Sequence, residues 1–121
     1  MELLQMEPNR ARSYRDGRLE IDCHAQTVLV DGAPVYLTPM EFDLLAQLAR
    51  NAGEILSRDT LMLNVWGYGP EILTRTMDVH LRRLRVKLGP YSRQHIETVF
   101  GLGYRLQPCN VPQMFTQAAR A

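Results

Sequence analysis

The chain has 121 residues, 45% of them hydrophobic and 22% charged, with a formal net charge of +1. This length suits one domain whose single core needs neither disulfide nor metal. No apolar run approaches the roughly 20 residues of a transmembrane helix, and residues 1–10 lack the features of a signal peptide. We therefore expect a cytoplasmic protein in which Cys23 and Cys109 are reduced.

The small net charge conceals a separation of charge along the chain. Residues 1–18 carry four Arg and three acids, and residues 19–73 carry two Arg and eight acids. Residues 74–121 carry seven Arg, one Lys and two acids. This separation predicts one oriented cationic surface for an anionic partner, with little general adhesion because the middle block repels the same anion.

The N-terminal third is predicted to form a small antiparallel sheet after a tail or linker at residues 1–10. Strands are expected at residues 12–15, 18–23, 27–30 and 34–37. Asp16-Gly17 and Asp31-Gly32 are two-residue hairpin signals. Apolar and acidic residues alternate along the second strand, which predicts that one face of this sheet is buried.

The first helix has clear sequence boundaries. Thr38, Pro39 and Glu41 match a capping box with proline at the first helical position. Gly53 is placed to end the helix in the left-handed conformation. The predicted buried stripe is Phe42, Leu45, Leu48, Ala49 and Ala52. Residues 54–56 follow as a candidate connecting strand.

A second helix is predicted from a cap at Ser57 through Trp66, ending at Gly67. Its apolar residues are Leu61, Met62, Val65 and Trp66. A loop at residues 67–73 separates it from a third helix. Two short helices in this order, the second of them cationic, predict a helix-turn-helix.

The third helix, residues 74–88, combines a narrow apolar stripe with a cationic face. The stripe is Met77, Leu81, Leu84 and Leu88. The cations are Arg75, Arg82, Arg83, Arg85 and Lys87, against the single acid Asp78. Taken alone, this stretch is either a solvated basic face or a helix for the major groove of DNA.

After Gly89 and Pro90 we expect a loop, followed by strands at 96–100 and 104–106 around a glycine-rich tip. A hairpin directly after a basic helix predicts a wing that reaches phosphates or the adjacent minor groove. Residues 108–121 show little pattern and are predicted to be a tail.

The sequence resembles a known family through several motifs in a fixed order. They are LTPMEFDLL, SRDTL followed by VWG, TRTMDVHLRRLRVKLG and IETVFGLGYRL. Over about residues 13–106 the chain resembles the DNA-binding, or effector, domain of OmpR/PhoB-type two-component response regulators. The resemblance implies an α+β fold, a winged helix-turn-helix with an N-terminal antiparallel sheet, three helices and a C-terminal β-hairpin wing, in a domain of residues 11–107. It also implies a transcription regulator that binds tandem repeats of double-stranded DNA, often as a head-to-tail homodimer.

The resemblance further implies roles for individual residues. The residues expected nearest the bases are Thr76, Asp78, Val79 and Arg83. Those expected mainly at phosphates are Arg75, His80, Arg82 and Arg85, with Lys87 completing the cationic set. Thr98 and Arg105 are the wing contacts, and Arg58 and Trp66 are weaker candidates on the second helix. In some members of the family a loop between the second and third helices contacts RNA polymerase. The residues that resemble this loop are Gly67, Tyr68, Gly69, Pro70, Glu71, Ile72 and Leu73.

Several of these residues also allow a structural interpretation. Asp78 is expected to orient a neighbouring Arg more than to read a base. Instead of contacting phosphate, Arg85 could form a salt bridge to an acid of residues 19–73. His80 could likewise be a buried histidine with its hydrogen bonds satisfied inside the domain. Trp66 and Tyr104 fit the core better than a DNA contact.

The chain departs from the family pattern at the wing, where Phe100 stands in place of a frequent Arg and Leu102 is also apolar. This departure keeps a second hypothesis open, a winged-helix module that binds RNA polymerase or another protein without reading sequence. No receiver domain precedes the motifs, so the chain is either a piece of a longer regulator or a stand-alone member. The 15 residues after Leu106 exceed the family's usual ending.

Catalytic and metal sites are not expected. Cys23-His24 has no second ligand pair at zinc spacing. Ser57 is explained as a helix cap, because the sequence places no His–acid pair beside it. We expect no enzyme activity and no cofactor.

Overall fold

The computed structural model describes residues 13–67 and 74–109, and for residues 74–76 it describes the backbone without the side chains. The predictions for residues 1–10 and for most of the C-terminal tail lie outside the described residues. Among those described, 13–35 with 108–109 form one compact unit and 36–107 form a second. The domain bounds 11–107 stay a prediction. No helix in the described ranges is long and apolar enough to cross a membrane.

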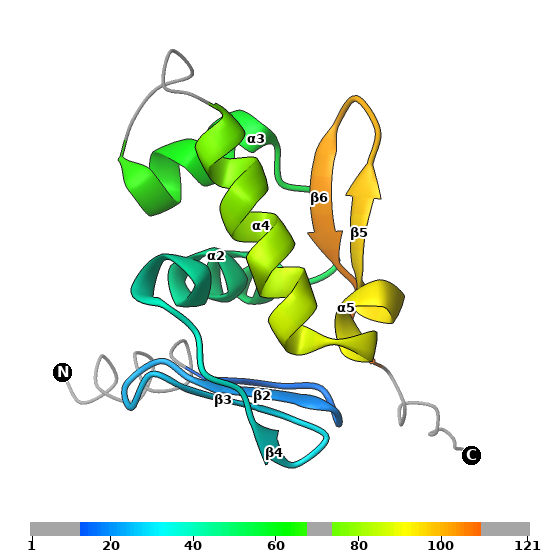
Figure 1. The fold of residues 1–121 in the computed structure, drawn as a ribbon. Coiled ribbons are helices and arrows are strands. Elements are labelled where there is room, and N and C mark those ends of the chain that lie inside the picture. The colour runs from blue at the N-terminus through cyan, green and yellow to red at the C-terminus, as the bar shows by residue number, and fades with distance from the viewer. Residues whose placement is uncertain (1–12, 68–73, 110–121) are drawn as a thin grey trace, which may run out of the picture. The chain divides into compact units, whose positions relative to one another are not determined.

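The first unit is an antiparallel sheet in which each strand pairs with the next (Figure 1). Its strands are β1 (Ser13–Arg15), β2 (Leu19–Asp22), β3 (Thr27–Val30) and β4 (Ala33–Pro34). The predicted sheet is therefore confirmed, although β4 is shorter than residues 34–37. After a last ladder bond from Val35 N to Val28 O, the chain leaves the sheet toward the helix cap at Thr38.

The first hairpin turn lies one residue later than predicted. Asp16 N donates to Leu19 O at 3.1 Å, which makes Gly17 and Arg18 the loop residues. The Asp16 carboxylate accepts hydrogen bonds from the backbone N–H of Arg18 and of Leu19, at 3.0 and 2.8 Å. Asp16 thus closes the turn with its side chain and is not one of the two central residues.

The turn at Asp31-Gly32 is confirmed, with φ angles of +53° and +84° at the two central residues. Such angles define the mirror-image turns that match strand twist in hairpins. The second strand ends at Asp22, so the predicted extension to Cys23 is wrong. Asp22 Oδ1 accepts from two following backbone N–H groups and starts a turn there.

The capping box of helix α2 (Pro39–Arg50) is confirmed. Thr38 Oγ1 accepts from Glu41 N at 3.2 Å, and Glu41 Oε1 accepts from Thr38 N at 3.0 Å. Gly53, with φ +88°, follows the helix in the left-handed conformation as predicted. The buried apolar residues are Phe42, Leu44, Leu45, Ala46, Leu48 and Ala49. Ala52 lies beyond the helix and is only half-buried.

The helix-turn-helix is built from three pieces. Helix α3 (Arg58–Leu61) is capped by Ser57, whose hydroxyl accepts from Thr60 N at 3.0 Å. It continues into a π-helical turn, η1 (Met62–Trp66), which ends at Gly67 with φ +81°. Helix α4 (Thr74–Leu88) has the predicted bounds. All four predicted stripe residues, Met77, Leu81, Leu84 and Leu88, are buried.

The loop predicted after Gly89 is wrong, because a short helix, α5 (Pro90–His95), occupies this place. Proline suits the first helical position, and the Ser92 hydroxyl lies 2.9 Å from Gly89 O and 3.0 Å from Arg85 O. Tyr91 is fully buried and anchors the turn. Six residues are too few to display a helical period in sequence.

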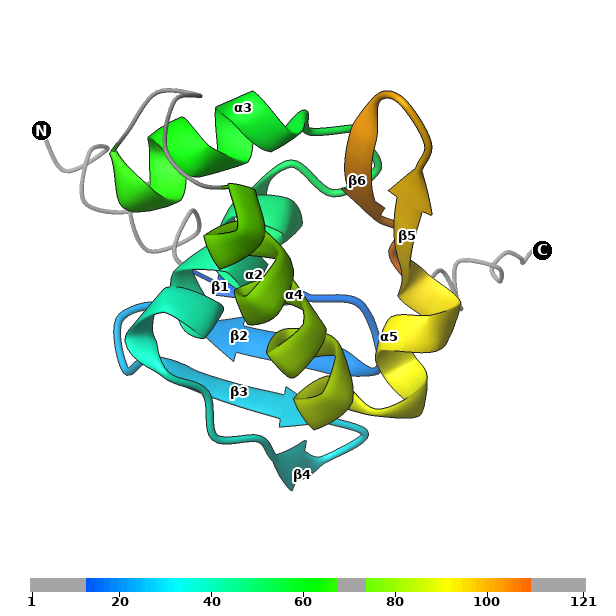
Figure 2. The same cartoon turned by 45° about the horizontal axis from the view of Figure 1, so that its top comes forward.

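The predicted C-terminal hairpin is confirmed as β5 (Ile96–Val99) and β6 (Gly103–Leu106). It stands beside α4, and α4 crosses α2 (Figures 1 and 2). The candidate strand at 54–56 is reduced to one bridge, in which Leu56 and Tyr104 exchange backbone hydrogen bonds of 2.8 and 2.9 Å. This bridge fixes the base of the hairpin to the segment that leads into α3.

A charged pair joins α4 to the first turn of α2. Lys87 Nζ lies 2.7 Å from Glu41 Oε1, and the Glu41 side chain is 1% exposed. Burial raises the pKa of the Glu41 carboxyl, but hydrogen bonds from Lys87 and the Thr38 backbone lower it more. The net pKa lies below the ordinary value of 4.5.

This pair predicts an acid-dependent stability. A carboxyl whose folded-state pKa is lowered stabilises the fold above its unfolded pKa, and the contribution is lost as pH falls through the folded-state pKa. We expect Glu41→Gln to lower the free energy of unfolding by about 1–3 kcal/mol at neutral pH, with the difference vanishing in acid. Urea unfolding over a pH series measures it, with exposed Glu54→Gln as the control. A difference that stayed constant into acid would contradict this role.

Candidate nucleic-acid interface

The outward face of α4 carries its free cations. Arg82 and Arg83 are exposed, and neither has a hydrogen bond or ion pair to any residue that the structure describes. Val79 and Val86 are also exposed, at 37% and 73%. This face follows from the helical period, because burying the stripe of Met77, Leu81, Leu84 and Leu88 turns these residues toward solvent. The result is an uncompensated positive surface with an apolar strip.

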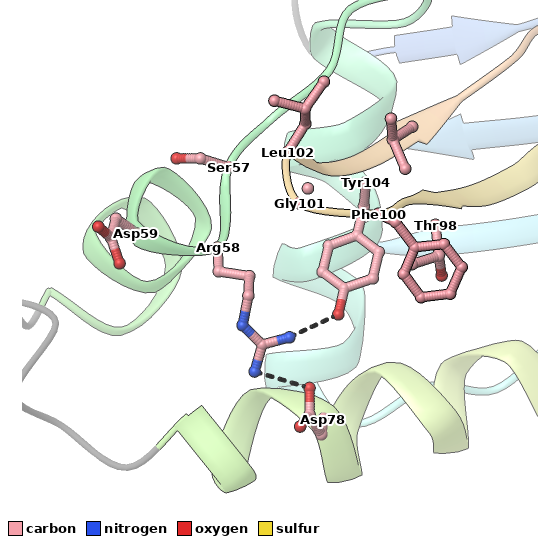
Figure 3. Close-up of a pocket in the computed structure, with 11 residues that line it drawn as sticks. Ser57, Arg58, Asp59, Asp78, Thr98, Phe100, Gly101, Leu102 and Tyr104 are labelled. Carbon is pink, nitrogen blue, oxygen red and sulfur yellow. Dashed lines mark hydrogen bonds and ion pairs between the residues drawn. The ribbon is translucent and has the colours of Figure 1, made fainter.

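Arg58 links three elements at one edge of this face. Figure 3 shows its side chain reaching from α3 to Asp78 on α4 and to Tyr104 on β6. Arg58 Nη2 lies 3.0 Å from Asp78 Oδ1, and Nη1 donates to the Tyr104 hydroxyl at 2.7 Å. The only acid of α4 is thereby compensated by a cation, which supports the orienting interpretation of Asp78.

Arg85 links α4 to the hairpin. Its Nη2 donates to Thr98 Oγ1 at 2.9 Å and to Ile96 O at 3.3 Å, and the guanidinium lies 5.8 Å from the centre of the Tyr104 ring. Among the described residues, Arg85 makes no salt bridge to the acids of 19–73, the alternative raised from sequence. The Arg85–Thr98 contact places both predicted phosphate ligands at the same spot.

The rings of Trp66 on η1 and His80 on α4 are in contact. Their rings are edge to face, with centroids 5.3 Å apart and an interplanar angle of 73°. Both side chains are half-buried, so each packs within the domain and still reaches the surface. Tyr104 is 6% exposed, which confirms its assignment to the core.

The cations at the ends of the predicted site are already engaged. Arg105 pairs with Glu97 across the hairpin, with Nε 2.8 Å from Glu97 Oε1. Lys87 is held by Glu41, so the structure supports a structural role for it. Neither is as available to an anion as Arg82 or Arg83.

Parts of the predicted site lie outside the described residues. These are the side chains of Arg75 and Thr76 and the loop residues Tyr68, Gly69, Pro70, Glu71, Ile72 and Leu73. The Tyr104 hydroxyl, as the acceptor for Arg58, was missed from sequence. The available signal was that a buried tyrosine hydroxyl needs a hydrogen-bond partner.

The described residues contain no group of three or more His, Cys, Asp or Glu side chains that could hold a metal ion. The described residues bring together the cationic helix α4, which is the second helix of the helix-turn-helix, and the β5–β6 hairpin fixed beside it. This arrangement defines a winged helix-turn-helix domain.

The chain belongs to the family described as transcriptional regulatory protein, C terminal, whose model matches residues 32–106. This is a family of DNA-binding transcription regulators and not a class of enzymes. The predicted resemblance to OmpR/PhoB-type effector domains is thereby confirmed.

Individual relatives agree with this assignment. The chain is 46% identical to the response regulator ArlR of Staphylococcus aureus over 87 residues, which are 71% of this chain and 40% of ArlR. It thus spans about 40% of the length of the curated relatives it matches. The RstA DNA-binding domain of Klebsiella pneumoniae, solved in complex with the RstA box, is 36% identical with a TM-score of 0.71, over 80% of this chain and 98% of that one.

The response regulator DrrB of Thermotoga maritima, an OmpR/PhoB homolog, is 29% identical with a TM-score of 0.73, over 88% of this chain and 52% of that one. These likenesses confirm the predicted fold class, an α+β winged helix.

Proposed function

We propose that this chain binds double-stranded DNA in a sequence-specific manner, with α4 in the major groove, as part of a transcription regulator. The observation that carries the proposal is the exposed Arg82–Arg83 pair, which no described acid compensates. An α-helix fits the width of the major groove, and arginine donates two parallel hydrogen bonds to guanine O6 and N7.

Within this proposal, Arg83 and Val79 read bases. Arg83 donates to a guanine, and Val79 contacts a thymine methyl group. Thr76 keeps its predicted place nearest the bases. Asp78 holds Arg58 and does not read a base itself.

Phosphate contacts are assigned to the rest of the surface. Arg82 is fully available, while Arg85 and Thr98 already share a hydrogen bond and together present a cation and a hydroxyl. Arg75 and His80 keep the phosphate roles that the family resemblance implies. These contacts fix the position of the protein on the duplex without carrying sequence information.

The molecules that this chain binds are inferred from its relatives and from its surface. The RstA domain was solved with its DNA box, which supports duplex DNA as the ligand of this chain. We further propose that the chain binds tandem repeats as a homodimer and acts in the cytoplasm. Contact of loop 67–73 with RNA polymerase is also part of this proposal. The alternative of a winged helix that binds only protein is not favoured by the family match.

The proposal is tested by fluorescence anisotropy against the duplex that the chain selects from a random-sequence library, called the operator duplex below. We expect affinity about 1,000-fold or more above that for a scrambled duplex. Log affinity should fall linearly with log salt, and Arg82→Gln should reduce the slope by about 0.9 because one phosphate contact is lost. Equal affinity for both duplexes, with no salt dependence, would refute the proposal.

A further inference from the structure

The tip of the hairpin exposes two large apolar side chains. Phe100 is 92% exposed and Leu102 is 60% exposed, on different sides of Gly101 (Figure 3). Single exposed apolar residues are common on protein surfaces. Two of them within a tight turn, where Gly, Asn, Asp and Ser are favoured, are unusual and indicate a contact outside the chain.

The tip is held in place from several directions. Leu102 N donates to Val99 O at 2.9 Å and closes the turn. Gly103 lies so close to the segment leading into α3 that an added Cβ would fall 2.0 Å from Leu56 O. Thr98 is bound by Arg85 of α4. Phe100 is therefore presented at a fixed position beside α4.

The surroundings of the tip select its partner. The hairpin is tied to α4 directly by Arg85–Thr98, and indirectly by Arg58 of α3, which contacts both Tyr104 and Asp78. The exposed cations of α4 attract a polyanion. With α4 in a major groove, a hairpin fixed beside it approaches the adjoining minor groove of the same duplex. Proteins that bind the minor groove often insert apolar side chains between base pairs and kink the duplex.

We propose that Phe100 is an apolar wedge that enters the minor groove beside the α4 site and partly unstacks one base step. Leu102 packs against the neighbouring sugars. Pyrimidine–purine steps, TA and CA/TG, unstack most easily, so the wedge selects for such a step at a position that no polar side chain reads. This inference rests on the proposed function, because α4 must hold the duplex.

The wedge predicts a change in DNA shape with little change in affinity. Burial of a Phe side chain and unstacking of a base step oppose one another and are of similar size. We therefore expect Phe100→Ala to weaken binding to the operator duplex by less than about 10-fold while removing the distortion. The side chain is 92% exposed, so the fold itself should not depend on it.

The experiment places the fluorescent base 2-aminopurine, in turn, at each step of the operator duplex that flanks the α4 site. For the full chain we expect a fluorescence increase at one step, retained in Phe100→Leu and lost in Phe100→Ala. Wild-type binding without any increase, or an increase that survives in Phe100→Ala, would overturn the wedge and leave the α4 proposal standing. Failure of the wild type to prefer operator over scrambled duplex would instead refute both.

Discussion

Replacing Gly103 by alanine is expected to lower the free energy of unfolding by about 3 kcal/mol or more. Gly103 has φ +146°, and an added Cβ would lie 2.0 Å from Leu56 O and 2.8 Å from Ser57 Cα. Both atoms belong to the backbone, so a rotamer change cannot relieve the contact. The strain would be relieved only by breaking the Leu56–Tyr104 bridge that fixes the hairpin.

The matched control is Gly101→Ala at the tip of the same hairpin. Gly101 also has a positive φ, +80°, but its added Cβ would meet nothing within 4 Å. This control should cost about 1–2 kcal/mol, the penalty of the left-handed conformation alone. Urea unfolding followed by circular dichroism separates the two variants. Equal losses of stability would show that the close approach to Leu56 does not constrain the wing.

Replacing Arg83 by alanine is expected to weaken binding to the operator duplex by about 10-fold or more, with a much smaller effect on scrambled DNA. The reason is that a bidentate contact to guanine discriminates among bases, whereas a phosphate contact does not. Anisotropy titrations on both duplexes at one salt concentration measure the ratio.

The control for Arg83→Ala is Arg50→Ala, an exposed residue in the last turn of α2 that changes the net charge by the same amount. It should leave the preference for the operator duplex intact. If Arg83→Ala weakened binding to both duplexes equally, Arg83 would be a phosphate contact and the base reader would have to be sought elsewhere on α4.

The local signals in this sequence were sufficient for the main elements of the fold. The capping box at Thr38 and Glu41 and the four-residue stripe of α4 each depend on neighbours within one or two helical turns. Such patterns are read directly from residue spacing. Helix α5 was not predicted, because six residues are too few to establish a period. Residues 62–66 were predicted to be helical, but their π-helical geometry was not.

The contacts that organise the candidate site could not be predicted in the same way. Arg58 meets Tyr104, and Lys87 meets Glu41, across 46 positions of sequence in each case. Charge patterning identified the cationic helix but could not tell which cations are already engaged. The structure pairs Lys87 with Glu41. Among the α4 cations whose side chains it describes, Arg82 and Arg83 have no hydrogen bond or ion pair, so the predicted DNA-binding surface is narrowed toward them.

The role of the wing residue Phe100 also could not be predicted from sequence alone. The sequence indicated that Phe100 departs from the family pattern, and this departure kept the hypothesis of a protein-binding module open. Because Phe100 is exposed on a hairpin that Arg85 ties to α4, we propose instead that the tip contacts the same duplex as the helix. The departure at Phe100 could therefore be interpreted only once the positions of the hairpin and of α4 were known.

The placement of α4 in the major groove is tested most directly by methylation interference on the operator duplex. Methylation of guanine at N7 blocks a major-groove acceptor without touching the minor groove. We expect that duplexes methylated at one or more guanines of the operator are excluded from the fraction bound by the chain, and that Arg83→Ala removes this exclusion. An even distribution of methylated guanines between bound and free DNA, for the wild-type chain, would contradict it.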